Sequence, residues 1–489
     1  MSSRKLLFAF GLAAGVLQAQ SKPAPAAGGA AQSSLPEPTK LVRLDVLATE
    51  DGKPVTDLTV DDFRVTDQGK DQKITSFRAR GAQPAPGPNE YSDRAEAAHP
   101  VVAVLFDLLN EVMADRMDAW RRIGRSLQQV QNGDSVYFYL LAVDGSLSPI
   151  HAIPESGSGA TGDGAWLQDL PKLMEKAKHD LNRPIPAGLQ DEDRVKKTYV
   201  GLEQLSTRLG AFPGRRSIVW VTDAVPYVTN PNVRCPGQWY DCSLYLPHVA
   251  ITLQANNTAV YPTSYAGGTD PTVGQVMDQF ASLTNGQAFF SKEIADVVAV
   301  ASQAASNSYA IAYDPSAEDW DSKMHHLHVT CSRKGVHVQT KEFYYALPDQ
   351  RPATARAQAA FVAALRSPSD VSEIGVRATV SPGADASKLH LQVHIDPADL
   401  MIQQQVDHFT GQAVIMFANY GADGMMKGEP ALQTIDLTLT SDQHQQVMKE
   451  GVPFAWDQSV DPAVKKVRVI VLDSYTDAIG SVTVPAGAH

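Results

Sequence analysis

The sequence lacks the short motifs that identify many enzyme families. It contains no Gly-x-Ser-x-Gly nucleophile elbow and no His-Glu-x-x-His zinc motif. The Gly-rich stretch from Gly157 to Gly164 lacks the Gly-Lys-Ser/Thr ending of a phosphate-binding loop. These absences remove the specific reasons to propose catalysis, and we predict that the chain is not an enzyme.

Long basic clusters and long apolar runs are also scarce. The 489 residues include 42 Lys and Arg against 54 Asp and Glu, which gives a net charge of −12. Basic residues cluster only in pairs such as Lys196-Lys197 and Arg215-Arg216. Nucleic acids and anionic membranes both require a basic surface, so neither is an expected partner. Beyond the N-terminus, no stretch is long and apolar enough to span a bilayer, which predicts no integral membrane segment in the processed chain.

The N-terminus resembles a secretory signal peptide. Arg4 and Lys5 precede an apolar stretch from Leu6 to Val16, and Ala19 offers a small residue for cleavage. The alternative, a buried N-terminal helix, would need a packing partner that the Ala/Pro/Gly-rich linker at 20–39 does not supply. We therefore predict a signal peptide over the first 19 residues, a disordered linker after it, and a periplasmic or secreted protein.

Cysteine is rare, with only three residues in the chain. Cys235 and Cys242 bracket a short loop, and in an oxidising compartment they are predicted to form a disulfide. Two free thiols remain the alternative, because spacing alone does not fix geometry. Cys331 lies in a strand-like run and is interpreted as a small buried hydrophobic residue.

The middle of the chain alternates between apolar runs and amphipathic segments. Val101 to Phe106 is a continuous apolar run closed by Asp107, and Ser217 to Thr222 is closed by Asp223. Such runs are typical of strands buried on both faces of a parallel sheet. Because helical patterns separate them, we predict an α/β domain over 98–346 with helices on both faces of a mostly parallel sheet.

Two further domains are predicted on either side of this α/β domain. Alternating residues and Gly-containing turns indicate a small β module over 40–80, and short strands over 366–489 indicate a β-sandwich. Within the α/β domain, Tyr309 to Tyr313 is predicted as its last alternating strand. The strand-like runs His326 to Cys331 and Val336 to Tyr344 are predicted as a hairpin at the edge of its sheet.

Several motifs resemble the VWFA-related domain family found in exported proteins of Acidobacteria. The resemblance covers nearly everything after the signal peptide and implies a von Willebrand factor type A-like, Rossmann-like fold that binds rather than catalyses. The motifs that carry it are Gly52-Lys53-Pro54-Val55-Thr56-Asp57-Leu58, Asp61-Asp62-Phe63-Arg64-Val65, Phe106-Asp107-Leu108-Leu109-Asn110, Gly214-Arg215-Arg216-Ser217, Val260-Tyr261-Pro262 and Tyr309-Ala310-Ile311-Ala312-Tyr313-Asp314-Pro315.

The resemblance also implies a position for a Mg²⁺ site, although the motif is degenerate. Where such domains have Asp-x-Ser-x-Ser, this chain has Asp107-Leu108-Leu109-Asn110-Glu111, so an aliphatic Leu109 replaces the first hydroxyl ligand. Asp223 matches the later aspartate and Thr198 is a weak match for the loop threonine. In the alternative that we favour, Asp107 and Asp223 cap helix starts or hydrogen-bond to the sheet edge, and no cofactor is bound.

The histidines at 325, 326 and 328 form a second candidate metal site. His326 and His328 would point the same way from a strand, but no third ligand has suitable spacing. A solvent-exposed cluster on an edge strand is the preferred interpretation.

Together these observations predict an exported, non-catalytic binding or assembly protein with a protein partner in the cell envelope or outside the cell. The ligand face is predicted at the carboxyl edge of the sheet, at Asp107, Asn110, Glu111 and Asp223, because open α/β sheets bind ligands there. The alternative is a hydrolase that uses Asp107 and Asp223 as general acid and base at the same edge.

Overall fold

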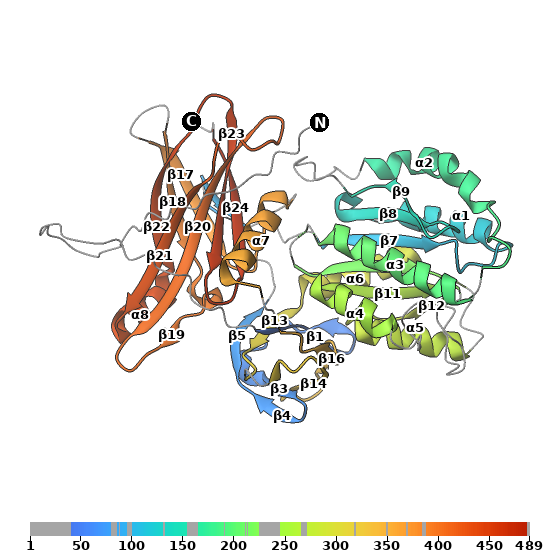
Figure 1. Ribbon diagram of the computed structural model, residues 1–489, viewed down its shortest axis with the longest axis horizontal. Helices are drawn as coiled ribbons and strands as arrows, with labels where there is room; N and C mark the ends of the chain where they lie inside the picture. The colour runs from blue at the N-terminus through green and yellow to red at the C-terminus, as the bar shows by residue number, and fades with distance from the viewer. Residues whose placement is uncertain are drawn as a thin grey trace, which may run out of the picture.

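The computed structural model shows three packed units (Figure 1). The unit with helices on both sides of a sheet lies at one end, a two-sheet unit formed mostly by the C-terminal third lies at the other, and a small β unit lies between them. The structure describes residues 41–79, 86–87, 89–94, 100–130, 133–153, 165–189, 191–210, 212, 214–223, 245–265, 271–316, 319–348, 351–367, 370–383 and 388–486. The predicted mixed α/β class is confirmed.

The α/β unit is built on a six-stranded sheet in which every neighbouring pair is parallel except the last. The strand order is β12 (Phe289–Phe290), β11 (Thr258–Ser264), β10 (Arg216–Val221), β7 (Val102–Asp107), β8 (Val136–Leu141) and β9 (Leu147–His151). The apolar runs at Val101 and Ser217 form β7 and β10, which lie side by side.

Six helices cover the two faces of this sheet. Alternate side chains of β7 point to opposite faces, so Ala103 and Leu105 belong to one apolar core and Val104 and Phe106 to the other. Three helices pack on the first core, namely α3 (Asp191–Leu209), α4 (Tyr245–Ala255) and α5 (Pro271–Leu283). The others pack on the second, namely α1 (Arg116–Leu127), α2 (Trp166–Leu181) and α6 (Ile294–Ser306). No described helix is long and apolar enough to cross a membrane.

The small β unit corrects two predictions from the sequence. The strands from Tyr309 onward do not extend the parallel sheet; they pair with the leading strands, so 40–80 does not form a β module of its own. One sheet contains β15 (His337–Gln339), β1 (Val42–Glu50), β13 (Tyr309–Tyr313) and β5 (Ile74–Ala79), with β2 (Lys53–Pro54) beside β1. The other contains β16 (Phe343–Tyr345), β14 (Met324–Cys331), β3 (Phe63–Asp67) and β4 (Lys70–Gln72).

The pairing follows from the shared core of this unit. Val46 and Val65 from the leading segment are buried with Ile311 and Val329 from the later one. Neither segment buries its apolar face alone, and more than 200 residues separate them in the chain. Antiparallel pairing over such a distance has no local sequence signal.

The C-terminal unit contains two sheets that enclose one apolar core. One sheet has β22 (Val452–Ser459), β18 (Lys388–Ile395), β17 (Val376–Pro382) and β6 (Glu90–Ser92); the other has β19 (Gln403–Gln404), β20 (Phe409–Gly421), β23 (Val464–Asp473) and β24 (Ile479–Pro485), with β21 (Ala431–Leu439) beside β20. Helix α7 (Ala353–Arg366) packs on β23 and β24, and α8 (Ser441–Glu450) precedes β22. Strand β6 pairs with β17 of the C-terminal unit. In the sequence, however, β6 precedes the whole α/β unit, so the C-terminal unit is built from two separate segments of the chain.

The β unit docks at the amino edge of the parallel sheet. Asn257, just before β11, donates to the Asp45 carboxylate over 2.7 Å, and Asn285 donates to the Asp45 carbonyl over 2.8 Å. Gln254 of α4 reaches the carbonyl of Phe343 over 3.1 Å. These contacts cover the amino edge of the sheet. The carboxyl edge, where Asp107 and Asp223 lie, is at the opposite end.

Gly286 lies at this docked edge, where the packing leaves no room for a side chain. A substitution by alanine tests this. An alanine Cβ at Gly286 would lie 1.8 Å from the Val260 carbonyl oxygen. We expect Gly286→Ala to lower the free energy of unfolding by at least about 2 kcal/mol, because the Val260 backbone must move. Urea unfolding followed by circular dichroism measures this.

Gly274 in α5 provides the matched control. The nearest atom to an added Cβ there is 3.8 Å away, so Gly274→Ala is expected to be neutral or to stabilise by up to about 1 kcal/mol. Equal stability changes for the two substitutions would contradict the packing described at Gly286.

Candidate functional site

The carboxyl edge of the parallel sheet brings the predicted acidic residues together. In the register of β7 with β10, Val221 pairs with Phe106, so Asp107 at the end of β7 and Asp223 just after β10 lie at the same rim. Glu111 lies on the loop that leaves β7, and its carboxyl group hydrogen-bonds to that of Asp223. The structure thus places Asp107, Glu111 and Asp223 at the same rim of the sheet.

Asp107 is the centre of a buried hydrogen-bond network. Its side chain is completely buried and accepts four hydrogen bonds. The donors are the Leu109 amide at 3.0 Å, the Asn110 amide at 3.1 Å, Asn110 Nδ2 at 2.6 Å and Trp220 Nε1 at 3.0 Å. Burial raises the pKa of Asp107, and the hydrogen bonds from Asn110 and Trp220 oppose this shift. Because all four donors are N–H groups, the network fits an ionised carboxylate.

Asn110 extends the network to helix α3. Its Nδ2 also lies 2.6 Å from the Thr198 hydroxyl, and Arg194 donates to its Oδ1 over 3.3 Å. The Thr198 hydroxyl in turn donates to the Arg194 carbonyl over 2.8 Å. Thr198 therefore does belong to the site, where it links α3 to the β7–α1 loop. Sequence reasoning missed Arg194 and Trp220, since neither residue type nor spacing distinguishes them from ordinary helix and core residues.

Arg116 fixes the far end of the same loop. The sequence alone does not identify this arginine as part of the site. Its guanidinium is fully buried and donates to three carbonyl oxygens, those of Leu108, Leu181 and Arg183. Burial lowers the pKa of Arg116, and the carboxyl groups of Glu111 and Asp107 raise it. A buried arginine with backbone acceptors holds loop geometry, because each carbonyl constrains the segment that carries it.

Glu111 and Asp223 form a pair of neighbouring carboxyl groups at this edge. Glu111 is only 2% exposed. Burial raises its pKa to about 9, and Asp223 adds to the shift through a hydrogen bond and charge repulsion. At neutral pH Glu111 is therefore protonated and donates to Asp223, which also accepts from the Ser264 hydroxyl over 2.8 Å. The second oxygen of Glu111, Oε2, is buried and has no hydrogen-bond partner among the described residues.

The tip of the β7–α1 loop is apolar and exposed to solvent. Val112 is 55% exposed and Met113 is 50% exposed, directly after the buried Glu111. Ala114 and Asp115 are exposed as well. A loop that is fixed from below by Asp107 and Arg116 thus presents two large apolar side chains at the carboxyl edge.

The geometry leaves few oxygen atoms for a metal ion at this edge. Four N–H donors occupy the Asp107 carboxylate, and the Leu109 side chain has no ligand atom. In the described part of the chain, no group of three or more His, Cys, Asp or Glu side chains is arranged to hold a metal. The network matches the alternative in which Asp107 hydrogen-bonds to the sheet edge.

The histidine cluster requires a correction. His326 and His328 are exposed on one side of β14, but His325 is buried and points to the other side. Its Nδ1 lies 2.9 Å from Asp67 Oδ1, and its Nε2 lies 3.2 Å from Asp321 Oδ1. His325 therefore belongs to a polar network in the core, not to a solvent-exposed cluster, because its register on β14 turns it inward.

The three cysteines are only partly described. Cys235 and Cys242, the predicted disulfide, lie outside the described residues. Cys331 is a free thiol at the end of β14, partly buried against the core of the β unit.

Comparison with known proteins finds solved structures that are similar to parts of this chain. No protein-family model matches the chain, and no curated protein matches it. The structure titled SpRpn10 VWA domain is 13% identical, covers 41% of this chain and 93% of its own, and has a TM-score of 0.23. The pilus adhesin SpaC from Lactobacillus rhamnosus GG, in an open conformation, is 11% identical, with 82% of this chain and 56% of the adhesin covered and a TM-score of 0.25. Both TM-scores are too low to support an argument, so the resemblance to the Acidobacteria family stays a prediction.

Protonated Glu111 predicts a specific pH dependence of stability. Between pH 4.5, the ordinary value for glutamic acid, and about 9, the folded chain binds a proton that the unfolded chain releases. The contribution of Glu111 to the free energy of unfolding is therefore most favourable at low pH. It falls as pH rises, by at most about 1.4 kcal/mol per pH unit. Glu111→Gln keeps a donor for Asp223 and should flatten this slope, so its melting temperature should exceed that of the wild type increasingly from pH 5 to pH 9.

Glu175, an exposed residue of α2, provides the control. Glu175→Gln should leave the wild-type dependence of melting temperature on pH unchanged. Parallel curves for Glu111→Gln and the wild type would show that Glu111 is ionised in the folded chain.

Proposed function

We propose that the chain is an exported, non-catalytic binding protein that recognises a protein partner through the carboxyl edge of its parallel sheet. In this proposal the α/β unit is a von Willebrand factor type A-like domain whose metal site has degenerated. The β unit and the C-terminal unit, proposed as a β-sandwich, act as spacers or accessory docking surfaces. Export rests on the signal-peptide pattern at the N-terminus.

The observation that carries the proposal is the exposed apolar tip on an anchored loop. Protein interfaces gain most of their affinity from a few large side chains that become buried on binding. Val112 and Met113 are such side chains, and the Asp107 and Arg116 hydrogen bonds hold their loop in place before binding. Pre-organisation reduces the entropy lost on association.

The charge around the tip indicates the chemistry of the partner. Asp115 and Asp118 are exposed beside the two apolar side chains. The complementary surface on a partner is an apolar pocket rimmed by Lys or Arg.

The alternative is a hydrolase that uses Asp107 and Asp223 as general acid and base at the same edge. The raised pKa of Glu111 beside Asp223 gives this edge one feature that is common among acid and base catalysts. The proposed partner of Asp223 in that mechanism, Asp107, is fully buried and already accepts four hydrogen bonds. A steady turnover of ester, peptide or glycoside substrates that is abolished by Asp223→Asn would favour hydrolysis over binding.

The double substitution Val112→Ser with Met113→Ser tests the binding proposal. Immobilised wild-type protein is expected to retain a partner from an envelope extract, and the variant should reduce its retention at least about tenfold, because the apolar anchors are lost. Quantitative mass spectrometry of the retained proteins measures this. Both side chains are exposed, so the fold should be unaffected.

Met425 and Met426 provide a matched control, since they are exposed on a turn of the C-terminal unit. Substituting both with Ser removes a similar apolar area and should leave retention of the partner unchanged. The proposal fails if the control reduces retention as strongly as the Val112 and Met113 variant does, or if neither variant changes it.

A further inference from the structure

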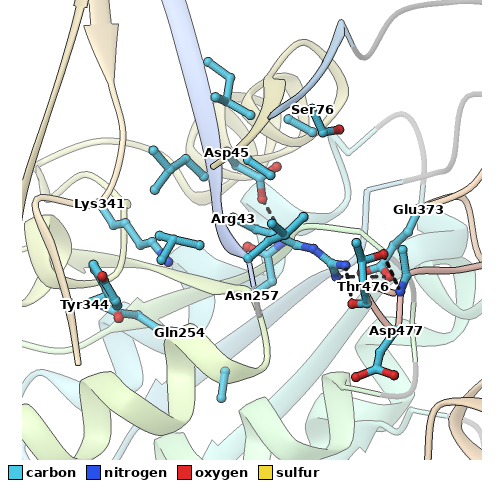
Figure 2. A pocket seen from close by; sticks show the side chains of 18 of the residues that line it. Arg43, Asp45, Ser76, Gln254, Asn257, Lys341, Tyr344, Glu373, Thr476 and Asp477 are labelled. Atoms are coloured by element: carbon cyan, nitrogen blue, oxygen red, sulfur yellow. Dashed lines mark hydrogen bonds and ion pairs between the residues drawn. The ribbon is translucent and has the colours of Figure 1, made fainter. Parts of the chain in front are cut away.

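A second concave site lies at the opposite end of the parallel sheet, where all three units meet. The cavity has a volume of about 850 Å³, in the range of small-molecule sites. Figure 2 shows side chains from each unit around it: Arg43 and Asp45 from β1, Asn257 before β11, and Thr476 from the C-terminal unit. The proposed function makes no use of this cavity.

Lys341 supplies a cation that the protein leaves unpaired. Its side chain points from the segment before β16 into the cavity (Figure 2), half-buried beside the Tyr344 ring, whose centroid is 5.9 Å from Nζ. Its ammonium group has no hydrogen bond or ion pair with any residue in the described parts of the chain. Burial lowers the pKa of Lys341 to about 8, and Asp45 partly offsets this shift.

The carboxylates that line the cavity already have partners, so none of them neutralises Lys341 by direct contact. Asp45 accepts a hydrogen bond from Asn257 over 2.7 Å. The other pairs are Glu373 with Arg43 at 3.4 Å, Asp399 with Arg78 at 3.6 Å and Asp477 with Arg356 at 3.0 Å.

Asn285 also lines the cavity. The residue is only 7% exposed, and its Nδ2 donates to the Asp45 carbonyl over 2.8 Å. Its Oδ1 is buried and has no hydrogen-bond partner among the described residues. Because this oxygen has almost no exposed surface, it adds a buried polar group behind the wall and is not within reach of a ligand in the cavity.

Apolar side chains form the remaining wall and limit the kind of ligand further. Ile251, Trp320 and Leu347 line the cavity beside the polar residues. We propose that this cavity binds a small organic anion, with its carboxylate on Lys341 and its apolar body against Ile251, Trp320 and Leu347. The site lies at the amino edge of the sheet and is independent of the protein-binding edge.

Calorimetric titration of the full processed chain with 3-(4-hydroxyphenyl)propanoate tests this site. The probe carries a carboxylate, an apolar ring and a hydroxyl donor. Saturable binding is expected at pH 7, and the neutral amide analogue should bind at least about tenfold more weakly, because it cannot form the charged contact with Lys341. Binding at pH 8 should take up protons, since the bound anion raises the pKa of Lys341, so the heat should depend on the buffer.

Lys341→Met should weaken binding of the propanoate at least about tenfold and remove the buffer dependence. Lys334→Met, at an exposed lysine of the β14–β15 turn, is the matched control and should bind like the wild type. Ser76→Glu, which places a carboxylate in the cavity wall, should also weaken binding and provides a second variant. The inference is overturned if the wild type shows no saturable heat at millimolar probe, or if the amide or Lys341→Met binds as tightly.

Discussion

The buried carboxylate of Asp107 is the interaction on which the candidate site depends. It lies at the end of a strand with no exposure to solvent and accepts four N–H groups, two of them from the backbone of the next loop. A buried charge without these donors would cost several kcal/mol. In the loop conformation that provides these donors, Glu111 lies against Asp223 and Val112 and Met113 are exposed.

Both proposals use the same sheet, with a protein-binding surface at one end and a small-molecule site at the other. At the carboxyl edge, hydrogen bonds are directed inward and the exposed tip is apolar, which suits a macromolecular surface. At the amino edge, the β unit and the C-terminal unit enclose a cavity into which Lys341 points (Figure 2), and its ammonium group has no hydrogen bond or ion pair among the described residues. The parallel arrangement of β12, β11, β10, β7 and β8 produces this division, because the carboxyl ends of these strands lie together.

The sequence predicts the parallel sheet well and its surroundings poorly. Runs such as Val101 to Phe106 are apolar at every position, which only a strand buried on both faces requires, and the acid that ends each run marks the rim. The acidic part of the candidate site follows directly from that pattern. Trp220 and Arg116 do not, because a tryptophan and an arginine become parts of the site only through the fold.

The small β unit shows the corresponding limit for topology. Tyr309 to Tyr313 has the same local pattern as a strand of the parallel sheet, yet it pairs with β1 and β5. The same holds for His325, whose inward direction depends on which face of β14 is covered. Local periodicity predicts that a strand forms, but the partner of that strand is chosen by contacts across the whole chain.

Amide hydrogen exchange in the β7–α1 loop tests most directly whether Asp107 organises this edge. In the wild type, the Leu109 and Asn110 amides donate to the Asp107 carboxylate and should exchange slowly. In Asp107→Ala they should exchange orders of magnitude faster, while amides of the β unit such as that of Ile311 keep their wild-type rates. Unchanged protection of Leu109 and Asn110 in Asp107→Ala would contradict the account, since the loop would then hold its shape without the carboxylate.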